Sequence, residues 1–512
     1  MEKIVSIINE NELFNLNQEE LNKLKHRNEL YFVGKDIKVY KNSLYKKNDV
    51  LFFIAKKESK KFLCLVSKNN FKSNFKYEIK ENDGIYIQKV LINYENFLVL
   101  KEIFPFTAPV SLRDKKTTFG CGDRLGLATP GHIRACLKYD IYPVLAQQSI
   151  RELNFTKTTY YDVVARTAFL VFQEGFERGY GADGDHLKTI EDIDIALKAG
   201  MPMITLDLSE VMNADAAEWS EDKINNEFEK LNSIEKDRIL STFADKTFSF
   251  GEASLTISLN EIKKCAVMYK SALDFAQHVD THLKKNRRDK YDLEISIDET
   301  TTPTLPEHHL FIIKELNHRK VTVNSLAPRF IGDFQKGIDY IGDIEEFENQ
   351  FIIHSEIAKA NGNYKISIHS GSDKFSIYPI IGKYTDMRLH LKTAGTSWLE
   401  AVRCIVKCNP SFYRKLHKKA FDYFDNATKF YHVTADLSKI KNIDDLDDHE
   451  IQEYLERNES RQLLHITYGG LLNDPDLRDE IFQILDDYED LHYELIQKHI
   501  DEHIELLGAP LL

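Results

Sequence analysis

Eight short apolar segments alternate with amphipathic helical segments between residues 117 and 392, and this alternation constrains the fold more than any other feature of the chain. Strands that alternate with helices form parallel sheets, because each helix returns the chain to the edge where the next strand begins. Eight such units in succession predict a closed (β/α)8, TIM-like barrel of the α/β class. The predicted strands are Thr117–Cys121, Ile141–Leu145, Gly179–Asp183, Pro202–Asp207, Tyr291–Ile297, Lys320–Ser325, Lys365–His369 and Met387–Lys392.

Capping residues mark the helices between these strands. Thr189 precedes an amphipathic segment that ends at Gly200, and Asp343 precedes one that ends at Gly362. Threonine and aspartate are favoured at the first cap of a helix, and glycine is favoured just after its end. The gap between the fourth and fifth strands, about residues 209–290, is too long for one helix, so we expect a helical insertion there.

The two ends of the chain have different patterns. Residues 1–110 alternate short apolar strands with lysine- and asparagine-rich turns, which predicts a small, mostly β accessory domain of α+β type. Residues 111–400 make up the predicted barrel domain with its insertion. Residues 401–512 are expected to form a mainly helical extension packed on the barrel, with two strand-like pieces at Phe430–Thr434 and Leu463–Tyr468.

Composition excludes several classes of function. The net charge of −13 argues against nucleic acid or an anionic membrane as the main partner. Six cysteines in 512 residues are too few for a disulfide scaffold, and the sequence shows neither a long apolar run nor a signal-peptide pattern. We therefore expect a cytoplasmic protein that acts on a small molecule. The sequence does not fix its oligomeric state.

Ionisable side chains collect where the predicted strands end. In a barrel of this kind the carboxyl ends of the strands carry the chemistry. The fifth strand, for example, places Glu294, Ser296 and Asp298 on one face. Buried charges need partners or a metal, and imidazole and carboxylate groups are the usual ligands of a divalent cation. We therefore predict a divalent cation, bound at three strand ends by His186, His369 and His390.

His354 is an alternative ligand. It lies in the middle of a predicted helix beside Phe351 and Ile352. Such a position faces the barrel wall rather than its mouth, so we interpret His354 as a packing residue or as a support for a ligand.

Two acids take different roles in this prediction. Asp185 precedes His186 and is the candidate general base, whereas Glu294 lies deeper, between Leu293 and Ile295. Desolvation at that depth would raise the pKa of Glu294 and keep it protonated, as a general acid requires. An alternative is a metal-free, aldolase-like site in which Lys392 forms a Schiff base.

Basic residues and a small-residue loop predict a site for an anionic substrate. Arg124, Arg151, Arg329, Lys374 and the amides of residues 370–372 could hold a carboxylate or a phosphate. No glycine-rich nucleotide motif follows a predicted strand. The predicted substrate-binding residues are Arg124, Gln148, Asn324, Arg329, Ser370, Ser372 and Lys392.

Seven blocks of the sequence resemble those of one family. They are FGCGDRLGLATPGHIRA, PVLAQQSIRE, GADGDHLK, ISIDETTTPT, RFIGDFQKGIDY, ISIHSGSDKFSIYP and LKTAGTSWLEAV. The likeness is to the tagaturonate epimerases, bacterial enzymes that interconvert tagaturonate and fructuronate in hexuronate breakdown. It covers the chain from about Phe119 to its last residue, while the first ~110 residues match only loosely.

The resemblance implies an activity and a set of roles. It implies a divalent metal, either Zn, Mn, Co or Ni, with Asp185 as proton acceptor and Glu294 as proton donor. It places metal histidines at His186 and His369 and leaves the third ligand open between His390 and His354.

The implied reaction has its own chemical logic. The two sugar acids differ at a carbinol carbon β to the ketone, whose C–H is not acidic, so simple enolisation cannot invert it. A retro-aldol cleavage followed by re-addition on the other face can invert it, given a base on the hydroxyl and a Lewis acid on the ketone. Two rival interpretations remain: a sugar-acid aldolase or isomerase on the same barrel, and a non-catalytic sugar-acid binding protein.

Overall fold

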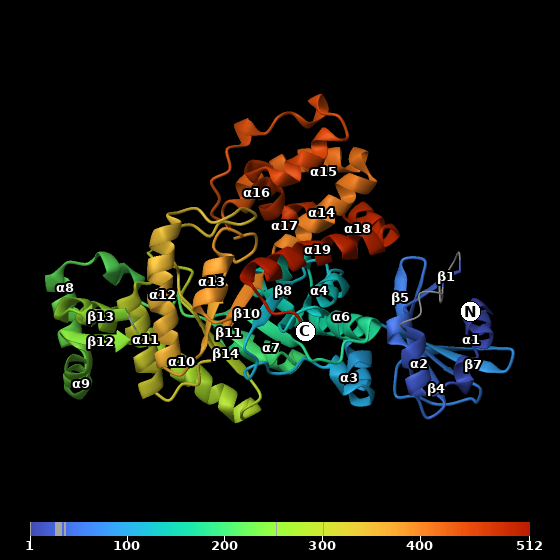
Figure 1. The fold of residues 1–512 in the computed structure, drawn as a ribbon, viewed down its shortest axis with the longest axis horizontal. Helices are drawn as coiled ribbons and strands as arrows, with labels where there is room; N and C mark the ends of the chain where they lie inside the picture. Colours follow the sequence, from blue (N-terminus) through green and yellow to red (C-terminus); the bar gives the residue numbers. More distant parts are fainter. Residues whose placement is uncertain (1, 26–32, 35–36, 252, 301) are drawn as a thin grey trace.

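A closed barrel of eight parallel strands forms the centre of the molecule (Figure 1). The computed structural model describes residues 2–25, 33–34, 37–251, 253–300 and 302–512. Around the barrel the strands run in the order β10-β11-β14-β15-β16-β17-β8-β9. Their bounds are β8 (Thr118–Gly122), β9 (Tyr142–Ser149), β10 (Gly181–Leu187), β11 (Met203–Asp207), β14 (Asp292–Ser296), β15 (Ser325–Ala327), β16 (Lys365–Ile368) and β17 (Leu389–Thr393). The predicted (β/α)8 fold is confirmed.

One predicted strand is displaced along the sequence. All eight observed strands overlap the predicted ones, but β15 does so only at Ser325, where the prediction placed the end of its strand. The side chain of Asn324 accepts a hydrogen bond from the backbone N–H of Leu293 at 2.7 Å, and the backbone N–H of Asn324 donates to the carbonyl oxygen of Leu293 at 2.9 Å. Asn324 therefore lies at the amino end of its strand, beside the start of β14.

Helices surround the barrel as the alternation predicts. The side chain of Thr189 caps α7 (Ile190–Ala199) by accepting from Asp192 N, and that helix ends at Gly200, whose φ of 102° is in the left-handed region. Asp343 caps the first turn of α12 (Ile344–Ala360) in the same way. The surrounding helices are α4 (Thr129–Cys136), α5 (Ile150–Thr156), α6 (Tyr160–Glu174), α7 (Ile190–Ala199), α10 (Leu259–Arg287), α11 (Pro306–His318), α12 (Ile344–Ala360), α13 (Tyr378–Tyr384) and α14 (Thr396–Cys408).

The insertion between β11 and β14 is helical, with one strand pair that the sequence did not predict. It contains α8 (Glu221–Glu229), α9 (Ser233–Phe243) and the long helix α10, and its antiparallel hairpin joins β12 (Lys246–Phe250) to β13 (Ala253–Ile257). In Figure 1 the hairpin, α8 and α9 project from the side of the barrel opposite the N-terminal sheet.

A small antiparallel sheet forms the N-terminal region. It comprises β1 (Val33–Gly34), β2 (Ile37–Val39), β3 (Tyr45–Lys47), β4 (Val50–Lys57), β5 (Lys60–Ser67), β6 (Tyr77–Asn82) and β7 (Ile85–Leu91), with helices α1 (Glu2–Glu10), α2 (Gln18–Lys25) and α3 (Tyr94–Ile103). Strands β2, β4 and β5 carry lysines that meet Glu489, the first residue of the C-terminal helix α19 (Glu489–Leu507). This contact ties the sheet to the other end of the chain.

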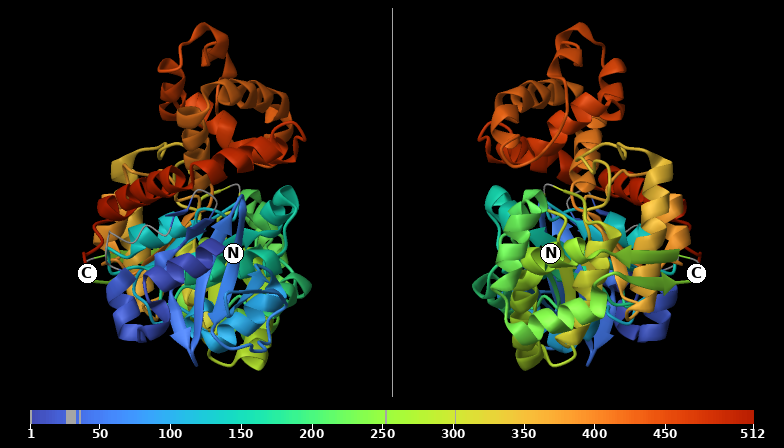
Figure 2. Two further views of the ribbon diagram at one scale, coloured as in Figure 1. Left: turned by 90° about the vertical axis from the view of Figure 1, so that its right-hand side faces the viewer. Right: turned by 90° about the vertical axis from the view of Figure 1, so that its left-hand side faces the viewer.

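Helices dominate the C-terminal region, and the two strand-like predictions there are wrong. Residues 463–466 lie in α16 (Asn458–Ile466), and residues 430–434 form no strand. A short apolar run does not distinguish a strand from one turn of a buried helix, and Leu463, Leu464 and Ile466 are all buried. The remaining helices are α15 (Pro410–Ala427), α17 (Tyr468–Asn473), α18 (Arg478–Asp487) and α19. Figure 2 shows this region standing over one end of the barrel. Across the described ranges, no helix combines the length and the apolar character needed to cross a bilayer.

Candidate active site

The carboxyl ends of the barrel strands open into a cleft of about 530 Å³. Its floor carries residues from the strand ends, among them Asp185, His369 and Lys392. Its other walls come from residues 328–337, which follow β15, and from residues 430–432 of the C-terminal region. The C-terminal region is therefore part of the site as well as a neighbour of the barrel.

Lys392 lies at the centre of a buried cluster of acids. Its Nζ is 2.5 Å from Asp185 Oδ1, 3.0 Å from Asp183 Oδ2 and 3.0 Å from Glu294 Oε1, and it donates to Thr205 Oγ1 at 2.6 Å. Burial opposes the ammonium form, but the three carboxylates raise the pKa of Lys392 well above its usual value. A Schiff base requires a neutral amine, so this arrangement argues against the aldolase-like alternative.

The three acids of this cluster differ in their affinity for a proton. Burial and the neighbouring Asp185 and Glu294 raise the pKa of Asp183 to about 6, although Lys392 opposes that shift. For Asp185, burial acts against ionisation, but Lys392 and His186 lower its pKa to about 2. For Glu294, burial is again outweighed by Lys392 and His369, and its pKa falls well below the usual value. The rise expected for Glu294 from burial alone is therefore wrong, because the depth that removes water also brings Lys392 to it.

Two of the three predicted metal ligands meet at the cleft. The rings of His186 and His369 lie 4.9 Å apart between centroids, and with Asp298 they offer ligand atoms that all lie within 4.8 Å of one another. His369 Nδ1 is 2.9 Å from Asp298 Oδ1. His186 adopts a φ of 52°, a left-handed conformation that is uncommon for a residue with a side chain and that concentrates at functional sites.

These residues fit a divalent cation. Two imidazoles and a carboxylate form a donor set typical of Zn, Mn, Co and Ni sites. His186 Nδ1 and Asp207 Oδ2 are buried 3.5 Å apart, and neither atom has a hydrogen-bond partner within the described part of the chain. Burial opposes a charge on His186, but Asp185 and Asp298 raise its pKa to about 10. The surrounding acids thus favour a positive charge here, either a proton or a cation.

The third predicted ligand does not join this group. Among the residues that the structure describes, His390 belongs to no cluster of potential ligands. It lies two residues before Lys392 on β17, which places it about 7 Å deeper in the barrel at roughly 3.3 Å per residue, and its Nδ1 is 2.9 Å from Thr118 Oγ1. His354 is no substitute, because it packs on α12 with its Nδ1 2.8 Å from His309 Nδ1. Asp298, two residues beyond the end of β14, lies with His186 and His369 instead.

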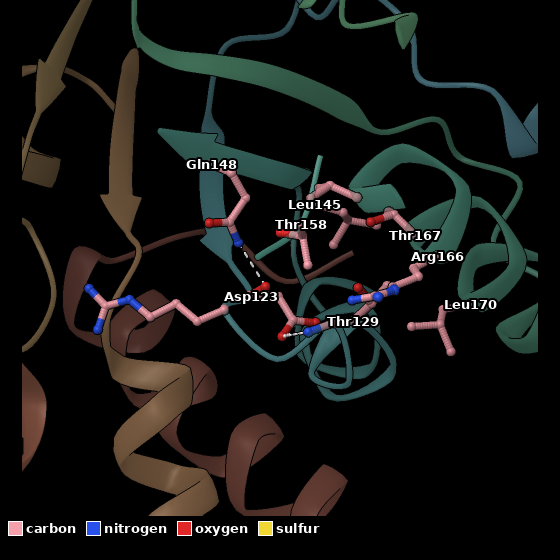
Figure 3. Close-up of a pocket in the computed structure, with 11 residues that line it drawn as sticks. Asp123, Thr129, Leu145, Gln148, Thr158, Arg166, Thr167 and Leu170 are labelled. Atoms are coloured by element: carbon pink, nitrogen blue, oxygen red, sulfur yellow. Dashed lines mark hydrogen bonds between the residues drawn. The ribbon is translucent and has the colours of Figure 1, made fainter. Parts of the chain in front are cut away.

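Most of the predicted substrate-binding residues line the cleft, but two do not. Gln148 faces outward from β9, where it lines a small cavity against α6 and donates from Nε2 to the carbonyl oxygen of Asp123 at 2.7 Å (Figure 3). Strand alternation turns its neighbour Gln147 into the cleft instead. Asn324 lies at the amino end of β15, as described above. The predicted residues that do line the cleft are Arg124, Arg329, Ser370, Ser372 and Lys392.

Lys374, which was predicted to bind an anion, instead bonds to backbone carbonyl groups. Its Nζ is buried and donates to the carbonyl oxygens of Gln335, Ile338 and Ser372 at 2.9, 2.5 and 2.9 Å. It therefore joins the loop after β16 to the 328–337 segment, and it does not line the cleft.

The sequence did not predict the cover of the cleft, which consists of residues 328–337 and 430–432. Gln335 Oε1 accepts from Thr434 N at 3.0 Å and from Gln462 Nε2 at 2.9 Å, so the 328–337 segment is bound to the C-terminal region. The same segment carries Lys336, whose Nζ donates to Ser370 Oγ at 2.8 Å. These contacts join residues about 30 to 130 positions apart, and no local pattern signals them.

Comparison with known proteins shows the family to which the chain belongs. The sequence profile of the tagaturonate epimerase family matches residues 40–507. The tagaturonate/fructuronate epimerase of Thermotoga maritima is 38% identical over 476 residues, which are 93% of this chain and 98% of the relative. Structures of the fructuronate-tagaturonate epimerase of Cohnella laeviribosi, native and with one glycerol, are 42% identical, cover 92% of this chain and 96% of their own, and have TM-scores of 0.88. The chain therefore belongs to the tagaturonate epimerase family and is an epimerase, an enzyme of the isomerase class.

Proposed function

We propose that this epimerase interconverts D-tagaturonate and D-fructuronate, with a divalent cation, by retro-aldol cleavage and re-addition at the carbinol carbon β to the ketone. The relatives named above support the substrate pair. The observation that carries the mechanism is the position of the buried acid–lysine cluster directly beside His186, His369 and Asp298.

His186, His369 and Asp298 would hold the cation, which when bound supplies a Lewis acid for the negative charge that develops on the ketone oxygen. The chain's own residues handle the protons. Asp185 is ionised at neutral pH and takes the proton of the carbinol hydroxyl. The carbon–carbon bond between that carbon and the one next to the ketone then breaks, its electron pair passes into an enediolate, and the hydroxyl oxygen becomes an aldehyde oxygen.

Inversion requires the aldehyde to turn before the bond reforms. Re-addition to its other face regenerates an alkoxide on the inverted carbon, and Glu294 delivers a proton to it. Glu294 is ionised at the start, so the proton that it delivers comes from Lys392, and Asp185 returns to Lys392 the proton that it took from the hydroxyl. Both carboxylates contact the Lys392 ammonium, at 3.0 and 2.5 Å. The sequence of steps neither gains nor loses protons or electrons.

The test is conversion of tagaturonate with and without EDTA, followed by chromatography of the products. We expect fructuronate only without chelator, and recovery when Zn, Mn, Co or Ni is added back. In D2O the inverted carbon should keep its original hydrogen, because its C–H bond is never broken. Deuterium at that carbon would refute the retro-aldol mechanism, and accumulation of three-carbon fragments in place of fructuronate would favour an aldolase.

A further inference from the structure

Charge is distributed unevenly around the cleft. Its floor holds the acids of the Lys392 cluster together with Asp298. Its other walls hold four basic side chains, Arg124, Arg151, Arg329 and Lys336, together with the acids Glu152, Glu299 and Asp333. A sugar acid carries a carboxylate at one end and a ketone and hydroxyls at the other, so a wall cation without a carboxylate partner can fix which end lies at the floor.

Two of the four cations are paired with carboxylates, and a third is bonded to a backbone carbonyl. Arg124 Nε is 3.2 Å from Glu152 Oε1, and its guanidinium lies 3.8 Å from the centre of the Tyr468 ring. Arg151 is 3.7 Å from Glu299 and donates to the carbonyl oxygen of Phe430 at 3.3 Å. The guanidinium of Arg329 donates to the carbonyl oxygen of Thr300.

Lys336 differs from Arg124 and Arg151, which are paired with acids, and from Arg329, which is bonded to a backbone carbonyl. Within the described parts of the chain, no carboxylate lies within 4 Å of its Nζ, and its hydrogen bond goes to the neutral hydroxyl of Ser370 at 2.8 Å. Burial, with Arg151 and Arg124 nearby, lowers the pKa of Lys336, so an anion beside it would stabilise its charge.

The position of Lys336 is fixed before any ligand arrives. Its neighbour Gln335 is bound through its side chain to Thr434 and Gln462 and through its carbonyl oxygen to Lys374. Ser370 directly follows His369, so the ammonium lies one residue beyond a candidate metal ligand. A charge held in this way costs little entropy to engage.

We propose that Lys336 binds the substrate carboxylate and so directs the ketone and the carbinol carbon toward the floor of the cleft. This inference rests on the proposed function, because it assumes a sugar acid. In the retro-aldol scheme the carboxylate stays on the aldehyde fragment. Lys336 therefore also retains that fragment while its aldehyde group turns.

The experiment compares binding of a hexonate with binding of the matching hexitol, which lacks the carboxylate. Neither ligand has a ketone, so neither can react, and inhibition constants or calorimetry measure affinity alone. We expect Lys336→Met and Lys336→Gln to weaken the hexonate by ~30-fold or more and the hexitol by less than ~3-fold, as loss of a charge-assisted hydrogen bond implies. Lys336→Arg should restore most of the hexonate affinity. Lys60→Met, which removes an exposed lysine from the N-terminal sheet, is the matched control and should change neither.

Two results would overturn the proposal. One is equal weakening of both ligands, or of neither, in both neutral variants. The other is unmodified protein that binds the hexonate no better than the hexitol. Failure of the proposed function looks different: unmodified protein would then prefer the hexonate in a Lys336-dependent manner and yet leave tagaturonate unchanged. With turnover intact, Lys336→Met should also raise KM for tagaturonate and release more of the aldehyde fragment.

Discussion

Replacing Glu489 by glutamine tests how the N-terminal sheet is held to the rest of the molecule. Glu489 is 7% exposed and accepts hydrogen bonds from the Tyr40 hydroxyl at 2.6 Å and the Tyr493 hydroxyl at 2.7 Å. It is also paired with Lys61, and it lies 3.2 Å from Lys38 and 3.9 Å from Lys56. The variant keeps the size of the side chain and removes its charge.

The expected loss in the free energy of unfolding depends on which lysine is left without a carboxylate partner. Lys38 keeps Asp490 at 2.8 Å, and Lys56 keeps Asp486 at 2.7 Å. Lys61 has no other carboxylate within 4 Å in the described residues, and its side chain is 15% exposed. Breaking a buried ion pair costs about 3–5 kcal/mol. Because the glutamine can still form hydrogen bonds, we expect about 2–3 kcal/mol.

Amide hydrogen exchange followed by mass spectrometry measures this loss where it occurs. Peptides from β4, β5 and α19 should exchange ~30- to 150-fold faster in the variant at pH 7, since 1.4 kcal/mol corresponds to a factor of ten. Glu489 ionises more readily when folded, because its neighbours lower its pKa below the unfolded value of about 4.3. Its contribution is therefore complete above that pH and is lost as the pH falls toward the folded pKa, so the difference should shrink below about pH 4.

Asp490→Asn is the matched control. Asp490 follows Glu489 on α19 and contacts Lys38 of β2. Its side chain is 79% exposed, and such a pair contributes less than about 1 kcal/mol to stability. Adding Lys61→Met to the Glu489→Gln variant should recover part of the loss by removing the unpaired charge. Equal exchange in the Glu489 and Asp490 variants, or no recovery in the double variant, would refute the reasoning.

Three further predictions concern the site and the packing of α19. His369→Ala should lose bound metal and turnover together, as metal analysis after dialysis and an epimerase assay would show; a metal content equal to that of the unmodified protein would contradict its role as a ligand. Glu294→Gln should keep its metal but lose at least ~100-fold in kcat, and retained turnover would remove its role as proton donor. Gly382→Ala should lower the stability by about 2 kcal/mol or more, because its Cβ would lie 1.8 Å from the carbonyl oxygen of Leu507 and force α13 away from α19; an unchanged melting temperature would contradict this.

Barrel topology could be predicted from the sequence because it depends on local periodicity. Each strand is an apolar segment followed by a capped helix, and the number of such units determines closure. The face of a strand on which each side chain lies is harder to predict. Strand β9 continues to Ser149, four residues beyond its predicted end, and the pairing between β8 and β9 shifts register after Gly120. Without that register, Gln147 and Gln148 cannot be assigned to the inner and outer faces.

Depth in the barrel explains why His390 lies apart from the other two predicted metal ligands. Residue type favoured three imidazoles, and a histidine two positions before Lys392 looked equivalent to those at the strand ends. Two residues of strand rise separate His390 from the mouth, whereas Asp298 follows the end of β14 and reaches it. The cover could not be predicted for another reason. Gln335 bonds to Thr434 and Gln462, which are 99 and 127 residues away, and the first was predicted in a strand while the second was left unassigned.

The cover formed by residues 328–337 and 430–432 has a consequence for the order in which the site is completed during synthesis. A ribosome completes all eight barrel strands at Thr393, yet the chain must extend through α16 before Gln462 can anchor the loop that bears Lys336. The nascent barrel thus emerges with its acids formed and its cleft open to water. The cleft walls formed by residues 328–337 and 430–432 therefore reach their final positions only with the last tenth of the polypeptide.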